Sequence, residues 1–364
     1  MLRSTPSFNT RRLAAASLST GVVVAIAVSA AVVAAFVMYY VMRRRQVHVE
    51  HELADMHTQY ALMQSSKLAS SETDDIDMRE LKICRLGLRQ LKLTTLLGSG
   101  DFADVWLATI QERPVAIKQL QEKTITRLQL QAFVDEIKLL HTMDSPFVVK
   151  LIGAAWSRPM DTKCVMELMD RGDLNTYLHT HDDVAFSWAA KYQHIECVVQ
   201  ALVYLHGRRL IHRDLKSKNV LLDSTKPTKV TGFGVAKEAI DATMTSGVGT
   251  FRWMAPEVIQ DQKYSVAADI YSFGMVLTEF DTHHAPFEDF RNSINGQPIP
   301  DSVIMIKVAE DSIRPSFTTN CPSWIYDMAS HCTAHNPEDR PSATQLLQMI
   351  RLKRNETSMD QFEL

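Results

Sequence analysis

The sequence predicts an α+β globular domain behind a single apolar helix. Of the 364 residues, 46% are hydrophobic and 22% are charged, a globular balance with room for one large core or two modest lobes. One uncharged apolar run, residues 21–42, stands apart near the start. After residue 77, segments with helical and with alternating patterns continue without a break or an internal repeat to about Arg351. A wholly disordered chain is therefore excluded.

The charge balance and the cysteines limit the partners and the cellular compartment expected for this protein. Lys and Arg number 39 against 42 Asp and Glu, so no bulk charge favours nucleic acid, and no nucleic-acid partner is expected. The five cysteines are odd in number and scattered, without a Cys-x-x-Cys pair or a histidine at metal-ligand spacing. A reducing compartment fits this pattern best.

Residues 21–42, GVVVAIAVSAAVVAAFVMYYVM, predict a membrane-spanning helix after a short N-terminal segment, residues 1–20. The run is long enough to cross the ~30 Å hydrocarbon layer. Tyr39 and Tyr40 favour the membrane interface and three arginines follow at residues 43–45, so the rest of the chain should face the cytosol, at the plasma membrane rather than an organelle. A cleaved signal peptide, a buried core helix and, because no acidic residue occurs in this region, a mitochondrial presequence are the alternatives.

Residues 43–90 are expected to form a juxtamembrane helix and an acidic linker. The apolar residues from Val49 to Met63 are spaced 4, 3, 4 and 3, and this helical stripe could pair two copies of the chain. Because only about two heptads are present, a short helix folded onto its own domain is an equal alternative. Residues 65–77 are small, polar and acidic, which is typical of a linker, and residues 353–364 predict a frayed tail.

Two glycines and a lysine carry the first chemical signal. Gly98 and Gly100, in LLGSGDFADVW, lie between β-prone flanks, where a backbone without side chains can approach phosphate oxygens. A glycine-containing hairpin is the ordinary alternative. PVAIKQL then places Lys118 on a mainly apolar strand, where a charged lysine needs an anionic partner. The expected partner is Glu136, which precedes Ile137 near the buried edge of a predicted helix.

The segment LIHRDLKSKNVLL, residues 210–222, crowds polar side chains between apolar stretches, and such density predicts a site; the ones singled out are His212, Arg213, Asp214, Lys216 and Asn219. Downstream lie GTFRWMAPEV, DIYSFGMVLTE and NPEDRPSATQLL. With these motifs in this order, the chain from about Leu91 to Arg351 resembles a eukaryotic protein kinase domain, of the serine/threonine type in the tyrosine-kinase-like group. The resemblance covers about 70% of the chain.

The resemblance implies a two-lobed fold over residues 91–352, with a small β-rich lobe containing one key helix and a larger helical lobe. It implies ATP as cofactor and phosphoryl transfer to a serine or threonine of a protein substrate. Asp214 would be the catalytic base, Lys118 would hold phosphates, Glu136 would fix Lys118, and Lys216 would contact the transferred phosphate. The residues expected around the nucleotide are Gly98, Gly100, Val105, Ala116, Lys118, Met166, Glu167, Met169 and Leu221.

Two further roles follow from the resemblance. Glu257 and Arg340 would form a buried ion pair that supports the larger lobe. Arg213 would receive a phosphate placed on the segment DATMTSGVGT, because a phosphate opposite arginine gains charge-assisted hydrogen bonds. The candidate acceptors there are Thr243, Thr245 and Ser246.

The segment TGFGVAK, residues 231–237, departs from the family pattern at one position. It lies 18 residues past Asp214, where the family has Asp-Phe-Gly, and Gly232 replaces the aspartate. That aspartate would bind the Mg²⁺ that bridges the β- and γ-phosphates, which leaves Asn219 as the one expected metal ligand and puts Mg²⁺ binding in doubt. Losing ~4 kcal/mol of metal-mediated stabilisation would slow transfer about a thousandfold.

Other carboxylates do not obviously replace the missing one. Asp223 is expected in a turn, and Asp101 would need the glycine loop to fold down. Two functions therefore stand side by side: a membrane-anchored serine/threonine kinase with strongly impaired transfer, and a pseudokinase that docks signalling proteins or switches an active kinase. A sequence error or an allelic variant at Gly232 is a third explanation of the departure.

Overall fold

The computed structural model describes residues 76–100, 102–121, 125–233, 251–260, 264–292 and 296–360. The chain divides into two compact units, and every described residue belongs to the second, which runs from Ala69 to Leu364. The predicted membrane span, the stripe from Val49 to Met63 and the candidate phosphate acceptors lie outside the described residues. Within the part that the structure describes, no helix is both long and apolar enough to cross a membrane.

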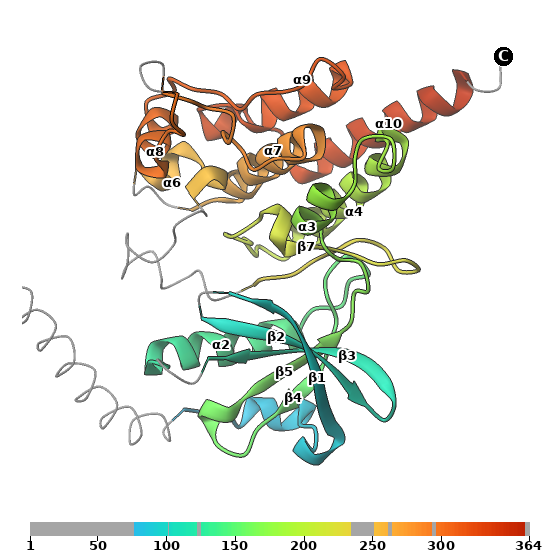
Figure 1. Cartoon of the computed structure of the whole chain (residues 1–364), viewed down its shortest axis with the longest axis vertical. Helices are drawn as coiled ribbons and strands as arrows, with labels where there is room; N and C mark the ends of the chain where they lie inside the picture. The colour runs from blue at the N-terminus through green and yellow to red at the C-terminus, as the bar shows by residue number, and fades with distance from the viewer. Residues whose placement is uncertain are drawn as a thin grey trace, which may run out of the picture. The chain divides into compact units, whose positions relative to one another are not determined.

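A five-stranded antiparallel sheet forms the first lobe, in the spatial order β1-β2-β3-β5-β4 (Figure 1). The alternating segments on either side of the two glycines become its first two strands. The strands are β1 (Leu91–Ser99), β2 (Ala103–Ile110), β3 (Arg113–Leu120), β4 (Leu151–Ala155) and β5 (Lys163–Glu167).

One long helix, α2 (Arg127–His141), lies alongside this sheet (Figure 1). It begins with a capping box, in which the Thr126 hydroxyl accepts from the Gln129 amide and the Gln129 side chain accepts from the Thr126 amide, at 3.2 and 3.0 Å. The predicted apolar stripe is buried, with Phe133, Ile137 and Leu140 in the core. Glu136 shares this buried side of the helix.

Residues 76–90, at the end of the region expected to form a juxtamembrane helix and a linker, fold onto the first lobe. They form two 3₁₀ turns, Glu80–Cys84 and Leu88–Gln90. Ile76 and Leu81 are buried in the main core, and the Leu86 amide donates to the Ala154 carbonyl of β4 at 2.8 Å. The acidic composition that predicted a linker therefore ends where these apolar residues begin.

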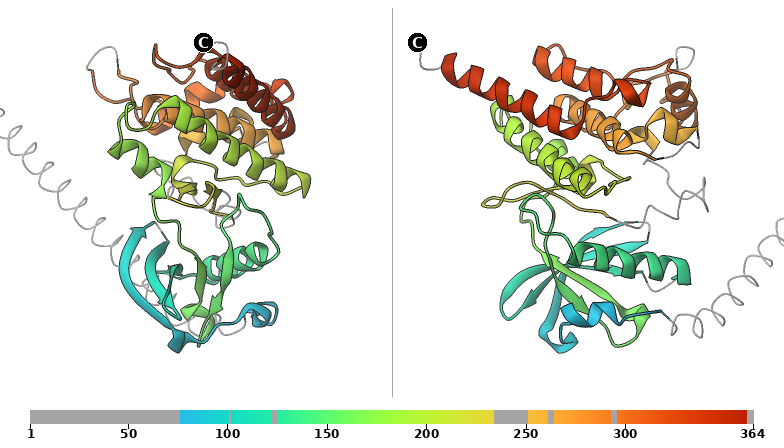
Figure 2. Two further views of the ribbon diagram at one scale, coloured as in Figure 1. Left: turned by 90° about the vertical axis from the view of Figure 1, so that its right-hand side faces the viewer. Right: turned by 180° about the vertical axis from the view of Figure 1, so that it is seen from behind.

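The second lobe is helical and is built around α7 (Val266–Thr282), most of which is buried. Helix α9 (Ser323–Cys332) packs along α7. Helix α10 (Ala343–Asp360) packs along α4 (Trp188–Gly207), and Figure 2 shows these two in red and yellow-green. Gly274 permits the first contact, because a Cβ there would lie 2.6 Å from the Thr333 side chain. The remaining helices are α3 (Leu174–Thr180), α6 (Pro256–Ile259) and α8 (Asp301–Ala309).

Helix α10 continues further than predicted, because its backbone is helical to Asp360 whereas a frayed tail was expected from residue 353. The helix is tied to α4 by Arg351 and Arg354, which both pair with Glu196. Such an ion pair between helices that are distant in sequence has no local signal. The observed architecture is otherwise the two-lobed α+β fold that the resemblance implies.

A three-stranded sheet, β6 (Gly172–Asp173), β7 (Val220–Leu222) and β8 (Lys229–Val230), accompanies the polar segment of residues 210–219. The predicted apolar strand is β7. Strand β8 also bonds the chain that leads into β4, through the Val149 amide to the Val230 carbonyl at 3.0 Å and the Val230 amide to the Phe147 carbonyl at 2.8 Å. The polar segment and residues 231–233 are thereby fixed beside the first lobe.

Candidate functional site

The strand register gathers several expected nucleotide residues into one patch of the sheet. Gly98 on β1 pairs with Val105 on β2, which pairs with Lys118 on β3. Ala116, two residues before Lys118, shares its face and pairs with Met166 on β5. The opposite face carries Val115 and Ile117 in a separate small core. The register therefore places these residues together without any assumption about a ligand.

Lys118 and Glu136 form the ion pair expected from the sequence. The Lys118 Nζ lies 2.8 Å from Glu136 Oε1 and 2.7 Å from Oε2. The Glu136 side chain is 3% exposed and that of Lys118 is 18% exposed. Because an unpaired charge at this depth would cost several kcal/mol, each side chain requires the other. The pair connects β3 to α2 and leaves part of the Lys118 ammonium accessible.

Glu167, one of the expected nucleotide residues, uses its side chain elsewhere. Its Oε1 accepts from the Lys150 amide at 2.8 Å and from Lys229 Nζ at 2.5 Å, while Lys226 Nζ lies 3.5 Å from Oε2. Any contact with a nucleotide would therefore come from the Glu167 backbone. Met166 and Met169 are both buried, and Leu221 on β7 is partly buried.

The polar loop is anchored by a buried carboxylate on α7. Asp269 is 1% exposed. Its Oδ2 accepts from the His212 amide at 2.8 Å and its Oδ1 from the Arg213 amide at 2.9 Å, and His206 Nε2 lies 2.9 Å from Oδ2. Arg213 itself has φ +69°, a left-handed conformation that is costly for a non-glycine residue and is maintained by these bonds.

Asp214, the expected catalytic base, lies inside a small hydrogen-bonded group. Lys216 Nζ lies 2.9 Å from Asp214 Oδ1, and Asn219 Nδ2 donates to Asp214 Oδ2 at 2.9 Å and to the Asp214 carbonyl at 2.6 Å. The Asp214 amide donates to His212 Nδ1 at 3.3 Å, and His212 Nε2 donates to the Thr231 carbonyl at 2.9 Å. The loop thus brings Asp214, Lys216 and Asn219 together, as the sequence predicts.

Gly232 lies against the Asn219 side chain. Its φ is +89°, and a Cβ built on it would lie 2.8 Å from Asn219 Cγ and Nδ2 and 2.9 Å from Oδ1. Contacts below 3.0 Å force a neighbour to move. The adjoining backbone is fixed, because the Thr231 amide donates to the Asn219 carbonyl at 2.9 Å. Asn219 therefore occupies the space that any longer side chain at position 232 would need.

The residues present fit ATP but do not fit the family's Mg²⁺ site. A paired, partly accessible Lys118 and an open glycine turn, with nothing within 4 Å of a Cβ at Gly98, are suited to phosphate oxygens. The metal side lacks its carboxylate at Gly232, and the Asn219 amide donates to Asp214. Mg²⁺ requires several oxygen ligands in near-ideal octahedral geometry, and these two positions offer it the Asn219 amide oxygen without the carboxylate.

No neighbouring carboxylate among the described residues replaces the missing ligand. Asp223 lies in a turn, as predicted, and accepts from the backbone amides of Thr225, Asp170 and Lys226. Burial alone would raise the pKa of Asp223, but these hydrogen bonds outweigh it and hold that pKa well below its usual range. Its oxygens are committed to the turn. Asp101 lies outside the described residues.

The expected ion pair between Glu257 and Arg340 is present, with both nitrogen–oxygen distances at 2.7 Å and both residues buried.

Arg213, the residue expected to receive a phosphate, has its guanidinium 5.5 Å from the centre of the Tyr264 ring. Burial, followed by the nearby charges of Asp214 and Asp269, raises the pKa of Tyr264 to about 12, so its hydroxyl stays protonated.

A family model described as a protein kinase domain matches residues 91–350. The chain belongs to the protein kinase family.

Curated relatives agree with this assignment. The chain is 32% identical over 265 residues to a Dictyostelium discoideum protein named "Probable serine/threonine-protein kinase drkB", covering 72% of this chain and 37% of that protein. It is 30% identical over 270 residues to serine/threonine-protein kinase STY46 of Arabidopsis thaliana, covering 74% of this chain and 45% of that protein. It is 31% identical over 269 residues to serine/threonine/tyrosine-protein kinase HT1 of Arabidopsis thaliana, covering 72% and 66%. This chain therefore spans less than half the length of drkB and STY46.

One buried acidic residue of the kinase domain was not predicted from the sequence motifs. Glu279 on α7 is fully buried beneath the polar loop and accepts from the Ser217 amide at 3.3 Å, the Ser217 hydroxyl at 2.5 Å and Trp253 Nε1 at 2.7 Å. Burial raises the pKa of Glu279 to about 7, although these hydrogen bonds oppose the shift. A glutamate inside the apolar run MVLTEF was the available signal.

Glu279 predicts a pH-dependent stability. Because its folded-state pKa of about 7 exceeds the ordinary value of 4.5, the folded state holds a proton that the unfolded state releases. This contribution to the free energy of unfolding is complete below about pH 4.5 and is lost as pH rises to 7 and above. At about 1.4 kcal/mol per pKa unit, the loss is about 3 kcal/mol.

Urea unfolding of the wild type and of Glu279→Gln between pH 5 and pH 8 measures this effect. The wild type should lose stability relative to the Gln variant as pH rises, since other titrating groups are common to both proteins. Parallel stability curves would show that Glu279 titrates at its ordinary pKa.

Proposed function

We propose that this chain is a membrane-anchored signalling protein whose kinase domain retains the nucleotide and base residues but transfers phosphate to protein serine or threonine only at a strongly reduced rate. One observation carries the proposal: Gly232 supplies no carboxylate where the resemblance places a metal ligand, which leaves the Asn219 amide oxygen as the one ligand from the two metal positions. The relatives' names support serine/threonine specificity, and Lys216 in DLKSKN agrees with it.

The retained residues have defined tasks in this proposal. ATP, when bound, supplies the phosphoryl group that is transferred. Lys118, held by Glu136, would neutralise phosphate oxygens, and the glycine turn would donate backbone N–H groups to them. Asp214 would orient the acceptor hydroxyl and accept its proton. Lys216, whose Nζ lies 2.9 Å from Asp214, would contact the phosphoryl group during transfer.

The rate is reduced because charge neutralisation by the metal is the part that this chain cannot support. A gap of ~4 kcal/mol in the transition state corresponds to about a thousandfold in rate. The same observation supports the alternative function, a pseudokinase that binds partners or switches an active kinase without transferring phosphate. Activity measurements separate the two.

Gly232→Asp should raise phosphate transfer from Mg²⁺-ATP to a generic protein substrate about a thousandfold over the wild type. The Asn219 side chain is short and can rotate away to admit the new carboxylate. Gly232→Ala is the matched control, since it introduces the same Cβ and the same backbone strain without a ligand, and it should not gain activity. Radiolabel transfer by the purified full-length chain is the measurement.

Two outcomes would contradict the proposal of a strongly reduced transfer rate. A wild-type rate equal to that of Gly232→Asp, abolished by Asp214→Asn, would show a fully active kinase and would contradict it. A wild type with no transfer at all, and a Gly232→Asp variant that stays inactive while folded, would favour the pseudokinase. Melting temperatures of all variants distinguish loss of fold from loss of chemistry.

The membrane anchor is a separate part of the proposal and rests on residues 21–42 and the arginines that follow. The stripe from Val49 to Met63 could pair two copies on the membrane surface. Membranes from cells that express the full chain should retain the protein after alkaline carbonate extraction. The double variant Val33→Asp with Phe36→Asp, which places two charges in the proposed span, should be released. Release of the unaltered chain by carbonate would contradict the anchor.

A further inference from the structure

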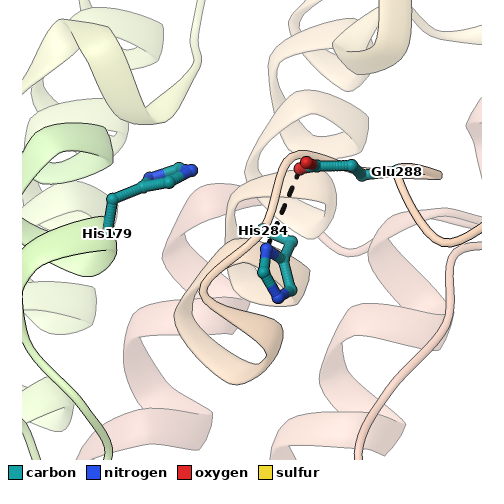
Figure 3. A group of neighbouring side chains, drawn as sticks. All are labelled: His179, His284 and Glu288. Carbon is teal, nitrogen blue, oxygen red and sulfur yellow. Dashed lines mark ion pairs between the residues drawn. The ribbon is translucent and has the colours of Figure 1, made fainter.

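Two histidines and a glutamate gather on the surface of the second lobe, among residues that have no place in the nucleotide site. His179 lies on the last turn of α3, and His284 and Glu288 lie on the loop that follows α7 (Figure 3). One ligand atom from each lies within 4.8 Å of the others, and all three side chains are exposed. We propose that these residues form a zinc site that bridges α3 to this loop.

The two histidines present suitable donor atoms. His179 Nδ1 donates to the Asn175 carbonyl at 2.7 Å, so in the neutral ring the Nε2 lone pair is available to a metal. This hydrogen bond from the second ring nitrogen is the usual support of a metal-bound histidine. The rings of His179 and His284 lie nearly perpendicular, at 83°, with centroids 6.4 Å apart. One nitrogen of each ring lies within 4.8 Å of the other, which is close enough for both to reach one ion after small side-chain rotations.

The Glu288 carboxylate is also held close to the two histidines. Glu288 Oε2 accepts from the Ala285 amide at 3.0 Å and lies 3.9 Å from His284 Nδ1 (Figure 3). Two imidazoles and one carboxylate are a ligand set that zinc accepts, with water at the fourth position. Nitrogen ligands at ~2.0–2.1 Å from a tetrahedral zinc lie about 3.3 Å apart, so rotation of exposed side chains closes the remaining gap.

A hydrogen bond joins the two segments that carry the ligands, which lowers the cost of ordering them when a metal binds. His283 ends α7 in the left-handed conformation, with φ +57° and its amide bonded to the Glu279 carbonyl at 2.9 Å. Its ring nitrogen Nδ1 lies 2.9 Å from the His181 carbonyl, just beyond α3. The two segments that carry the ligands are thus connected before any metal arrives.

Zinc is the metal of choice because imidazole and carboxylate together suit a borderline divalent ion, whereas Mg²⁺ and Ca²⁺ prefer oxygen ligands alone. The proposal is independent of phosphate transfer. The zinc site is expected whether the kinase domain is active or inactive.

Calorimetric titration of the metal-free, reduced full-length chain with ZnCl₂ tests the site. The wild type should bind one equivalent in a saturable step. His179→Ala, His284→Ala and Glu288→Gln should each weaken this step at least about 10- to 100-fold, the loss that even outer-shell changes produce. Zinc should also raise the melting temperature of the wild type and not that of His179→Ala, since the ion connects two segments.

His331→Ala is the matched control. His331 is also exposed on a helix, with Nδ1 bonded to the Asp327 carbonyl at 2.6 Å, and it lies on α9 away from the ligand set. This variant should bind zinc like the wild type. The proposal is overturned by the absence of a saturable step, or by a step that the three ligand variants leave unchanged, as binding to the free cysteines would be.

Discussion

The buried carboxylate of Asp269 is the constraint on which the rest of the site depends. It holds the backbone of His212 and Arg213 against α7. His212 in turn bonds the Thr231 carbonyl, and the Thr231 amide bonds the Asn219 carbonyl. This chain of hydrogen bonds determines how close residue 232 comes to Asn219. A buried charge with several well-placed donors is stable where an unpaired one would not be.

Gly232 has therefore more than one consequence for the site. It removes a carboxylate, and it also lets the Asn219 side chain lie where a Cβ would otherwise be. There Asn219 donates to the Asp214 carboxylate, a charge-assisted bond worth ~1.5–3 kcal/mol. A side chain at 232 would have to displace Asn219 and adopt φ +89°, which costs ~1–3 kcal/mol for a residue other than glycine. Position 232 therefore lacks a ligand and also lies in contact with the residue expected to supply the other one.

The local features of the domain follow from the sequence. The buried stripe of α2 is visible as a periodicity, and the pairing of Lys118 with Glu136 follows from the cost of a lone charge on an apolar strand. The turn at Asp223 is predicted by its position after a strand and before STKPTK. Such features depend on neighbours within a few residues, or on one strong electrostatic requirement.

The features that sequence reasoning missed depend on contacts between distant segments. The packing of Ile76 and Leu81 onto the first lobe requires a surface built from other parts of the chain. The lysines that occupy the Glu167 side chain come from the β7–β8 region, some sixty residues later. The position of Asn219 against Gly232 is likewise set by Asp269, which no local pattern indicates.

The affinity of the full-length chain for ATP, measured by calorimetry with and without Mg²⁺, tests most directly whether this site has lost its hold on the metal. The account predicts that Mg²⁺ changes the wild-type affinity less than about threefold and strengthens that of Gly232→Asp at least about tenfold, or ~1.4 kcal/mol. A wild-type affinity that rises tenfold with Mg²⁺, with no further gain in Gly232→Asp, would contradict it.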